Sequence, residues 1–271
     1  ATSVAGPPQP PVAATLAAMD LPADAILGDL RTVDRLRADR VADAALGARV
    51  AQLKHYQQRR FERTYADLLQ STRYTKAAQF FLDELYGPAD FSQRDAQFAR
   101  VVPALVRLFP AEVVDTVATL ARLHALSEQL DTDMAGHLPP AADTPVDATR
   151  YVRAWGATGR QGDRQQQIDL TLAVGQCLDR FTRNPVLRHS LRLMRAPARA
   201  AGLAQLQTFL ESGFDTFAAM KGAAHFLSTV REREEGLVRA LFDAAARCGA
   251  DSAANACHEL AAVLHPGSLL P

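Results

Sequence analysis

The sequence contains few cysteines and no long apolar run. Its three cysteines, Cys177, Cys248 and Cys257, lack the paired spacing that a disulfide framework or a cysteine-based zinc site requires. No stretch approaches the roughly eighteen consecutive apolar residues of a transmembrane helix. The proline-rich residues 1–19 lack the continuous apolar core of a secretory signal. We therefore expect a cytoplasmic protein without membrane contacts, in which residues 1–19 are poorly structured.

An excess of charge of either sign is also absent, because 30 lysine and arginine residues balance 30 aspartate and glutamate residues. Proteins that bind nucleic acid or an anionic membrane through general electrostatic attraction carry a basic excess. Nucleic acid is therefore not an expected partner. Any affinity for an anion has to arise from a local group of basic residues.

Recognisable catalytic and cofactor-binding motifs are missing as well. The chain has no Gly-x-Ser-x-Gly elbow, no phosphate-binding glycine loop and no Glu-x-x-His metal signature. His124 and Glu128 lie one helical turn apart, which fits a shared metal-ligand set or an ordinary surface pair. His189 and His225 fit either an axial haem ligand or a histidine of the core or its boundary. The sequence thus predicts no catalytic residue, no metal ligand and no specific cofactor.

Apolar residues at helical spacing are abundant, in a composition that is 48% hydrophobic. Ile26, Leu30 and Val33, for example, recur at steps of four and three, which is the period of one helix face. No segment of useful length shows the strict two-residue alternation of a half-buried strand. We predict an all-α fold, a multi-helix bundle of about eight to ten helices without a sheet.

The helices are expected to form a single domain over residues 20–271. Two segments, 48–135 and 145–247, resemble a helical unit used twice, because each combines a short apolar helix that ends at proline with longer helices. Aligned without gaps, Phe98 matches Leu210, although residue identities are poor. A duplicated unit and a chance match between amphipathic helices both fit this pattern.

Three helix boundaries follow from proline and capping residues. Asp20 followed by Pro22 predicts a helix start with proline in its first turn. Residues 92–95 resemble a capping box with aspartate in its last position, so Asp95 is expected to bond the backbone at a helix start. A final helix is expected from Asp251 to about Leu264.

The same periodicity assigns side chains to the core or to the surface. The helix that begins near Ala48 places Gln57 and Arg60 largely opposite its apolar face. Gly213 is expected to permit the close approach of a neighbouring backbone. Eight phenylalanines are interpreted as core rather than as a ligand pocket: Phe80, Phe81, Phe91, Phe98, Phe209, Phe214, Phe217 and Phe226.

The strongest local charge feature is the interval 180–210, which holds six arginines and no acidic residue. Four of these arginines are spaced by four, three and four residues, and they form a candidate binding site: Arg188, Arg192, Arg195 and Arg199. Guanidinium groups aligned in this way can bind phosphate or carboxylate bidentately. The alternative is that they pair with acids elsewhere in the fold, such as Glu211 or Glu232, or face solvent.

Three strings carry a resemblance to a known family: FFLDELYGP at 80–88, DFSQRD at 90–95 and LMRAPAR at 193–199. Over residues 50–245 the chain resembles an uncharacterised proteobacterial all-helical family with FFLxxLYGP and LMRxPA motifs. The resemblance implies one fold-sized helical unit. It brings neither an activity nor functional residues.

The function that the sequence favours is non-enzymatic binding or regulation. In this interpretation the arginine-rich helix contacts an acidic protein or a phosphorylated small ligand. The alternative is a helical metal- or haem-binding protein with a sensing or redox role and a cavity between its two halves. The sequence identifies neither the ligand nor the oligomeric state.

Overall fold

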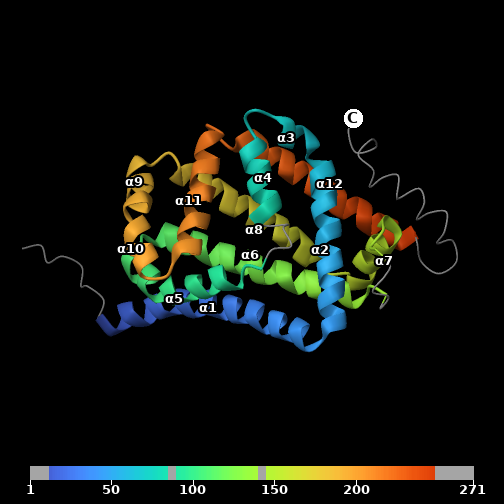
Figure 1. Ribbon diagram of the computed structural model, residues 1–271, viewed down its shortest axis with the longest axis horizontal. Helices are drawn as coiled ribbons and strands as arrows, with labels where there is room; N and C mark the ends of the chain where they lie inside the picture. The colour runs from blue at the N-terminus through green and yellow to red at the C-terminus, as the bar shows by residue number, and fades with distance from the viewer. Residues whose placement is uncertain (1–11, 85–89, 140–144, 248–271) are drawn as a thin grey trace, which may run out of the picture.

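The computed structural model describes residues 12–84, 90–139 and 145–247, and every regular element in these ranges is an α-helix (Figure 1). The helices are α1 (Val12–Ala42), α2 (Ala44–Thr64), α3 (Ala66–Gln70), α4 (Thr75–Glu84), α5 (Ser92–Leu108), α6 (Ala111–Gly136), α7 (Ala148–Thr158), α8 (Gln161–Phe181), α9 (Pro185–Leu193), α10 (Arg195–Ala200), α11 (Ala204–Ala219) and α12 (Ala224–Arg247). Apart from the short α3 and α10, all of them have nine residues or more. The predicted all-α multi-helix fold is confirmed.

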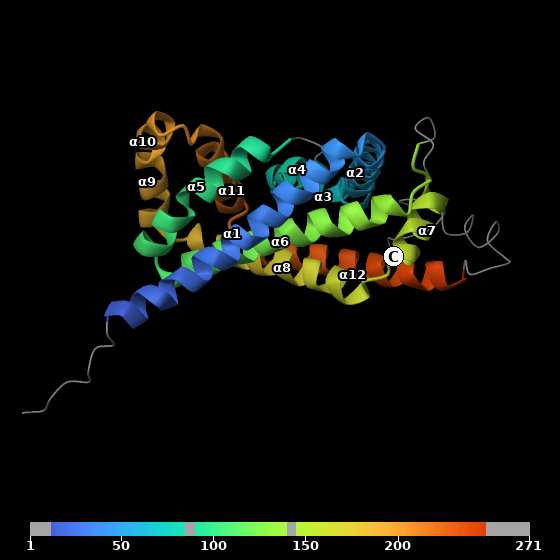
Figure 2. The same ribbon diagram turned by 90° about the horizontal axis from the view of Figure 1, so that it is seen from below.

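The longest helices form one layer of the molecule. Helices α1, α6, α8 and α12 lie side by side, each contacting the next (Figure 2). Helices α2, α4 and α11 stand across this layer in the view of Figure 1, where α2 contacts α6 and α11 contacts α8. Helices α9 and α10 lie at one end of the molecule and α7 at the other. Side chains from the long and the crossing helices therefore meet in the interior.

Two apolar clusters form the core. The smaller cluster joins α1, α5 and α6, where Ile26 and Leu30 pack with Val102. The larger cluster draws on α2, α4, α7, α8, α11 and α12, and its fully buried members include Leu53, Phe61, Tyr151, Phe217 and Phe226. Because removing one such side chain from water contributes about 1.5 to 3 kcal/mol, these clusters are the main source of stability.

The predicted start of the first helix is wrong. Helix α1 begins at Val12, so Pro22 lies inside it, where the missing N–H removes one backbone hydrogen bond. Residues 12–19, predicted to be poorly structured, therefore belong to a helix, while residues 1–11 lie outside the described residues. The helix predicted at 251–264 also lies outside the described residues.

The predicted capping box is wrong as well. Helix α5 begins at Ser92 without a side-chain cap. The backbone N–H and the hydroxyl of Ser92 donate to Asp90, at 2.9 and 3.0 Å. Asp95 is buried and faces the interior, where it pairs with Arg37 of α1 and with its neighbour Arg94. Burial against charged partners has taken precedence over local capping.

A close contact explains the glycine in the middle of α11. A β-carbon at Gly213 would lie 3.2 Å from the ring of Phe80 on α4, which is tighter than ordinary packing. The predicted neighbour was a backbone, and the observed one is an aromatic ring. The absence of a side chain at Gly213 therefore lets α4 place this ring against α11.

The two predicted halves pack against each other. Helix α6 contacts α8, and α11 contacts α4 and α5. The duplication itself stays a prediction. Among the helices of the described ranges, none combines the length and apolarity that crossing a membrane would require.

Candidate functional site

The predicted arginine site lies on α9 and α10 at one end of the molecule (Figure 1). Arg188 and Arg192 lie 2.8 and 4.0 Å from one carboxylate oxygen of Asp215 on α11. Arg195 donates to both carboxylate oxygens of Glu211 at 2.7 Å. These three arginines therefore have acidic partners within the fold, as the alternative interpretation proposed.

The remaining arginine, Arg199, is exposed and has no acidic partner within 4.0 Å in the described part of the chain. Helix α9 buries no residue. Three apolar side chains of this region are largely exposed: Val186 at 69%, Leu193 at 64% and Met194 at 51%. We call α9 and α10, with these arginines and apolar side chains, the arginine surface.

A second candidate site lies in the interior, between the long and the crossing helices. It is a pocket of about 190 Å³, lined by residues of both core clusters and of both predicted halves. Along α6 the lining extends from Val117 to Asp131, a distance of about 21 Å at the helical rise per residue. The pocket is therefore elongated, and its two ends have different linings.

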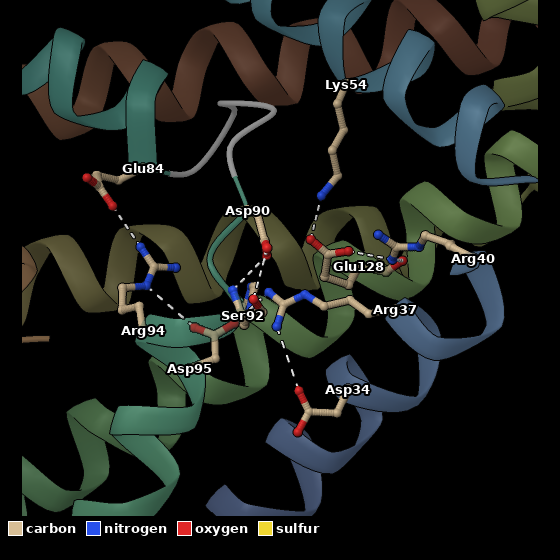
Figure 3. A network of polar contacts seen from close by, with 11 residues as sticks. Asp34, Arg37, Arg40, Lys54, Glu84, Asp90, Ser92, Arg94, Asp95 and Glu128 are labelled. Atoms are coloured by element: carbon tan, nitrogen blue, oxygen red, sulfur yellow. Dashed lines mark hydrogen bonds and ion pairs between the residues drawn. The ribbon is translucent and has the colours of Figure 1, made fainter. Parts of the chain in front are cut away.

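One buried acid at this pocket joins three helices. Glu128 of α6 accepts a hydrogen bond from Lys54 of α2 at 2.5 Å and another from Arg40 of α1 (Figure 3). Burial alone would raise the pKa of the Glu128 carboxyl, but Lys54 and Arg40 outweigh it and hold the pKa at about 2. Glu128 is therefore an anion at neutral pH, compensated by two cations.

One turn further along α6, Asp131 has a different environment. Its carboxylate accepts a hydrogen bond from Gln57 Nε2 at 2.9 Å. Burial raises the pKa of the Asp131 carboxyl, an effect that Lys54 opposes and Glu128 reinforces. The pKa values of two neighbouring acids are thus shifted in opposite directions, which is a frequent property of functional sites.

The third buried acid of the pocket comes from α12. Glu234 accepts hydrogen bonds from Arg60 at 2.9 Å and from the Tyr65 hydroxyl at 2.8 Å. Gln57 and Arg60 were predicted to lie opposite the apolar face of α2, which implied a surface position. That implication is wrong, because the two residues are only 7% and 8% exposed. Both are tolerated inside because each binds an acid on another helix.

Helices α7 and α8 add an aromatic ring and a guanidinium group. The Arg164 guanidinium lies 4.1 Å from the centre of the Trp155 ring, a cation–π contact. Arg164 also donates to Gln167 at 3.4 Å, and Gln167 donates to Ser127 at 2.8 Å. Trp155 is 5% exposed, and its buried Nε1 has no acceptor among the described residues. A buried donor without an acceptor costs free energy that a bound ligand can recover.

Tyr151 indicates that these groups share one space. Burial raises the pKa of its hydroxyl, Arg60 and Arg164 oppose this shift, and Asp131 and Glu234 add to it. We call this part of the lining the polar end of the pocket. Its residues are Lys54, Gln57, Arg60, Ser127, Glu128, Asp131, Tyr151, Trp155, Arg164, Gln167 and Glu234.

A further ionic cluster lies near the middle of the lining. His124 Nε2 lies 2.8 Å from Asp95 Oδ2, and Arg37 of α1 donates to the same oxygen at 2.6 Å. Arg94 lies between Asp95 and Glu84 and donates to Glu84 at 2.7 Å (Figure 3). Burial alone would raise the pKa of Asp95, but these partners, His124 first, hold it at about 2. Asp95 thus ties α1, α5 and α6 together.

Toward Val117 the lining is hydrophobic. What we call the apolar end consists of Leu105, Val117, Leu120, Ala121, Leu206 and Leu210. Leu210 is 41% exposed, so this end reaches the molecular surface beside α11. Of the eight phenylalanines interpreted as core, Phe81, Phe91, Phe98 and Phe209 line the pocket. Phe81 and Phe98 also pack in the core clusters, so the core interpretation of the eight stays a prediction.

The described residues form no metal-binding group. Within the described ranges, no three His, Cys, Asp or Glu side chains are close enough together to hold a metal ion. His124 binds Asp95 and Glu128 binds Lys54, so neither predicted interpretation of His124 with Glu128 describes them. His189 and His225 are exposed and do not line the pocket. A metal or haem cofactor stays a prediction.

Sequence reasoning missed the polar end, although one signal was available. On α6 the positions Val117, Leu120, His124, Ser127 and Asp131 follow one another at steps of three and four residues, so they share a helix face. A face that begins apolar and continues with polar side chains indicates a lining rather than a core. The contributions of α2, α7, α8 and α12 gave no such signal, because they meet only in the folded chain.

Comparison with known proteins adds a family. A family model described as "Domain of unknown function (DUF8198)" matches residues 36–248. No curated protein and no solved structure matches the chain. The matched range contains every residue of the polar end and of the apolar end, whereas most of α1 precedes it.

Proposed function

The chain belongs to the DUF8198 family, whose function is unknown, and we propose that it is a non-enzymatic binding protein that holds a small molecule in the interior pocket. One observation carries the proposal. The pocket joins an apolar end to a polar end, and the buried Trp155 Nε1 at the polar end finds no acceptor in the described part of the chain. The proposal places the protein in the cytoplasm of a proteobacterium, as the sequence predicts.

The dimensions of the pocket support a small ligand. An apolar cavity of about 150 Å³ accommodates benzene, so about 190 Å³ suffices for a somewhat larger molecule. Ligand sites combine a mainly hydrophobic lining with a few convergent polar groups. The pocket has this composition, because aromatic and aliphatic side chains surround the buried charges of α2, α6, α8 and α12.

A fluorescence titration tests the proposal, because Trp155 is the only tryptophan of the chain. The probe is 1-octanol, a neutral amphipath, and its binding is expected to change the Trp155 emission saturably. Val117→Phe fills the apolar end and should weaken octanol binding about tenfold or more. The matched control is Val113→Phe, one turn earlier on α6 and outside the lining, which should bind as the unmodified chain does. Equal binding by both variants would refute the pocket as the site.

We propose the arginine surface as a second binding function, for an acidic protein or a phosphorylated small ligand. The supporting observation is that Val186, Leu193 and Met194 are exposed beside the arginines. Exposed apolar groups next to guanidinium groups are typical of protein interfaces. Arg188, Arg192, Arg195 and Arg199 are the proposed contacts.

Charge reversal tests the arginine surface. Arg192→Glu combined with Arg199→Glu should abolish salt-sensitive binding of poly-glutamate and of inorganic pyrophosphate. Arg239→Glu, an exposed change on α12, is the control for net charge. If the control loses binding to the same degree, the interaction is nonspecific and this second proposal fails.

A further inference from the structure

The outer side of α9 has the composition of a contact face, although it lies in solvent. Val186, Ser190 and Leu193 follow one another at steps of four and three residues, so they share one face of the helix. All three are exposed. Leu187 and Leu191 lie on the other side and are half-buried, and α9 contacts α11. Helix α9 is therefore apolar on two sides, and the described residues cover only one of them.

Exposed apolar side chains are concentrated at this helix. A surface helix usually buries one apolar stripe and turns polar side chains to water. Of the seven large apolar side chains that are exposed in the described ranges, three lie within residues 186–194: Val186, Leu193 and Met194. Single exposed apolar side chains are ordinary, whereas a group of them marks an interaction site.

The charge around this face is positive. Six arginines lie between residues 180 and 199, and four of them have an acid of their own within the described part of the chain, in the pairs Arg180–Glu112, Arg183–Asp179, Arg188–Asp215 and Arg195–Glu211. Six cations against four acids leave two positive charges without compensation.

The uncompensated charges belong to two arginines of the surface. Arg192 lies 4.0 Å from an Asp215 oxygen that Arg188 approaches at 2.8 Å, so its own pairing is loose. Arg199 has no acidic partner within 4.0 Å among the described residues. Both are exposed. An incoming carboxylate can bind either guanidinium without displacing an acid that the fold already places there.

Resting on the second binding function proposed above, we propose that the arginine surface docks an acidic amphipathic helix of another protein. The apolar side of that helix covers Val186 and Leu193, and its carboxylates bind Arg192 and Arg199. Two helices that pack lengthwise interlock side chains three and four residues apart. The steps from Val186 to Ser190 and from Ser190 to Leu193 have this period.

The combination of charge and apolar area selects this occupant. A second copy of the chain that met α9 with its own α9 would bring the same arginines face to face, and like charges in an interface repel. A phosphorylated small molecule would neutralise Arg192 or Arg199 but leave Val186 and Leu193 in water. An acidic helix with an apolar side satisfies both requirements.

Two peptides of identical composition test the proposal on the full chain. Each has about 20 residues, enough for an isolated helix. In the amphipathic peptide, leucine recurs at alternating steps of three and four residues with glutamate beside it. In the scrambled peptide the same residues are reordered, so the charge is kept and the apolar side is lost. Calorimetry should show that the amphipathic peptide binds about tenfold or more tightly than the scrambled one.

Variants locate the contact. Val186→Ser combined with Leu193→Ser should reduce the affinity of the amphipathic peptide to that of the scrambled one. Both positions are exposed, so the fold should tolerate the changes. The matched control is Val41→Ser on α1, where the valine is 85% exposed, and it should keep the full preference. Arg192→Glu combined with Arg199→Glu should abolish the binding of both peptides.

The outcomes separate this inference from the second proposed function. If both peptides bind equally and Arg192→Glu with Arg199→Glu weakens both, the surface is an anion site and the helix inference is overturned. A dimer that Val186→Ser with Leu193→Ser dissociates, measured by analytical ultracentrifugation, assigns the face to a second copy and overturns it too. Tighter binding to phosphatidylglycerol vesicles than to the amphipathic peptide has the same consequence. If neither peptide, poly-glutamate nor pyrophosphate binds, the inference and the second function both fail.

Discussion

The polar end of the pocket and the arginine surface contain the same kinds of groups in opposite settings. Glu128 is buried and compensated by cations from α1 and α2. Asp215 is about half exposed and is approached by Arg188 and Arg192 from a single neighbouring helix. Breaking a buried pair costs about 3 to 5 kcal/mol, whereas an exposed pair contributes about 1 kcal/mol or less. The same chemistry therefore stabilises the fold in one region and contributes little to stability in the other.

The difference shows that charge clustering along the chain is a poor guide to where charges act. The arginines of the arginine surface are neighbours in sequence and meet water. The charges of the polar end come from four separate helices, α2, α6, α8 and α12, and meet only after folding. Desolvation, and not the number of charges, sets their energetic weight.

The largest expected effect comes from Glu128→Gln. The change leaves Lys54 and Arg40 without their carboxylate, and it should reduce the free energy of unfolding by about 3 to 5 kcal/mol, measured by urea denaturation. Asp215→Asn is the matched change on the arginine surface, and its loss should be about 1 kcal/mol or less. Equal losses would remove the energetic distinction between the two regions.

Acid should reveal the same carboxylate. The pKa of Glu128 falls from 4.5 to about 2 on folding, so the unfolded chain binds more protons than the folded chain between these values. Stability from Glu128 is thus present above about pH 4.5 and is lost as the pH falls to about 2, by roughly 3 kcal/mol. Glu128→Gln should show a shallower decline over this interval, measured by denaturation at each pH. Asp95 contributes its own loss of stability in acid to both the unmodified chain and Glu128→Gln. If the stabilities of the two proteins declined in parallel, the assignment to Glu128 would be contradicted.

Tyr65→Phe should have a smaller effect. The Tyr65 hydroxyl donates to Glu234 at 2.8 Å, and Arg60 continues to hold that carboxylate after the change. We expect a loss of about 2 kcal/mol, because a hydrogen bond to a buried charged group is removed. Thermal and urea denaturation measure the loss. A neutral result would mean that the Tyr65 hydroxyl does not stabilise the Glu234 carboxylate.

The smallest expected effect is that of Arg192→Ala on the arginine surface. Arg192 is exposed and lies 4.0 Å from Asp215, which Arg188 approaches more closely. Its removal should change the free energy of unfolding by less than about 0.5 kcal/mol. A destabilisation comparable to that of Tyr65→Phe would show that this surface is structural rather than open to a partner.

Much of the fold was predictable because apolar periodicity reports burial directly. Ile26, Leu30 and Val33, predicted as one helix face, are all buried. The start of α1 was not predictable from Pro22, because a helix can lose one hydrogen bond and continue. The position of Asp95 was not predictable from local capping patterns, because its partners Arg37 and His124 come from α1 and α6.

The candidate site was less accessible to sequence reasoning. Arg60 and Gln57 have the polarity of surface residues, and only the arrival of Glu234 and Asp131 makes them interior residues. Trp155 was readable as apolar core, because nothing in the chain indicates that its N–H lacks an acceptor. Such properties belong to contacts between distant segments, which periodicity along one helix does not encode.

The indole N–H of Trp155 offers the most direct measurement. Because the chain has one tryptophan, an isotopically labelled sample shows a single indole resonance in an NMR spectrum. At saturation with 1-octanol, we expect a downfield shift of this resonance as the N–H gains the hydroxyl oxygen as an acceptor, and no shift in Val117→Phe at the same octanol concentration. An indole resonance that stays in place while calorimetry shows octanol bound would contradict the proposed site.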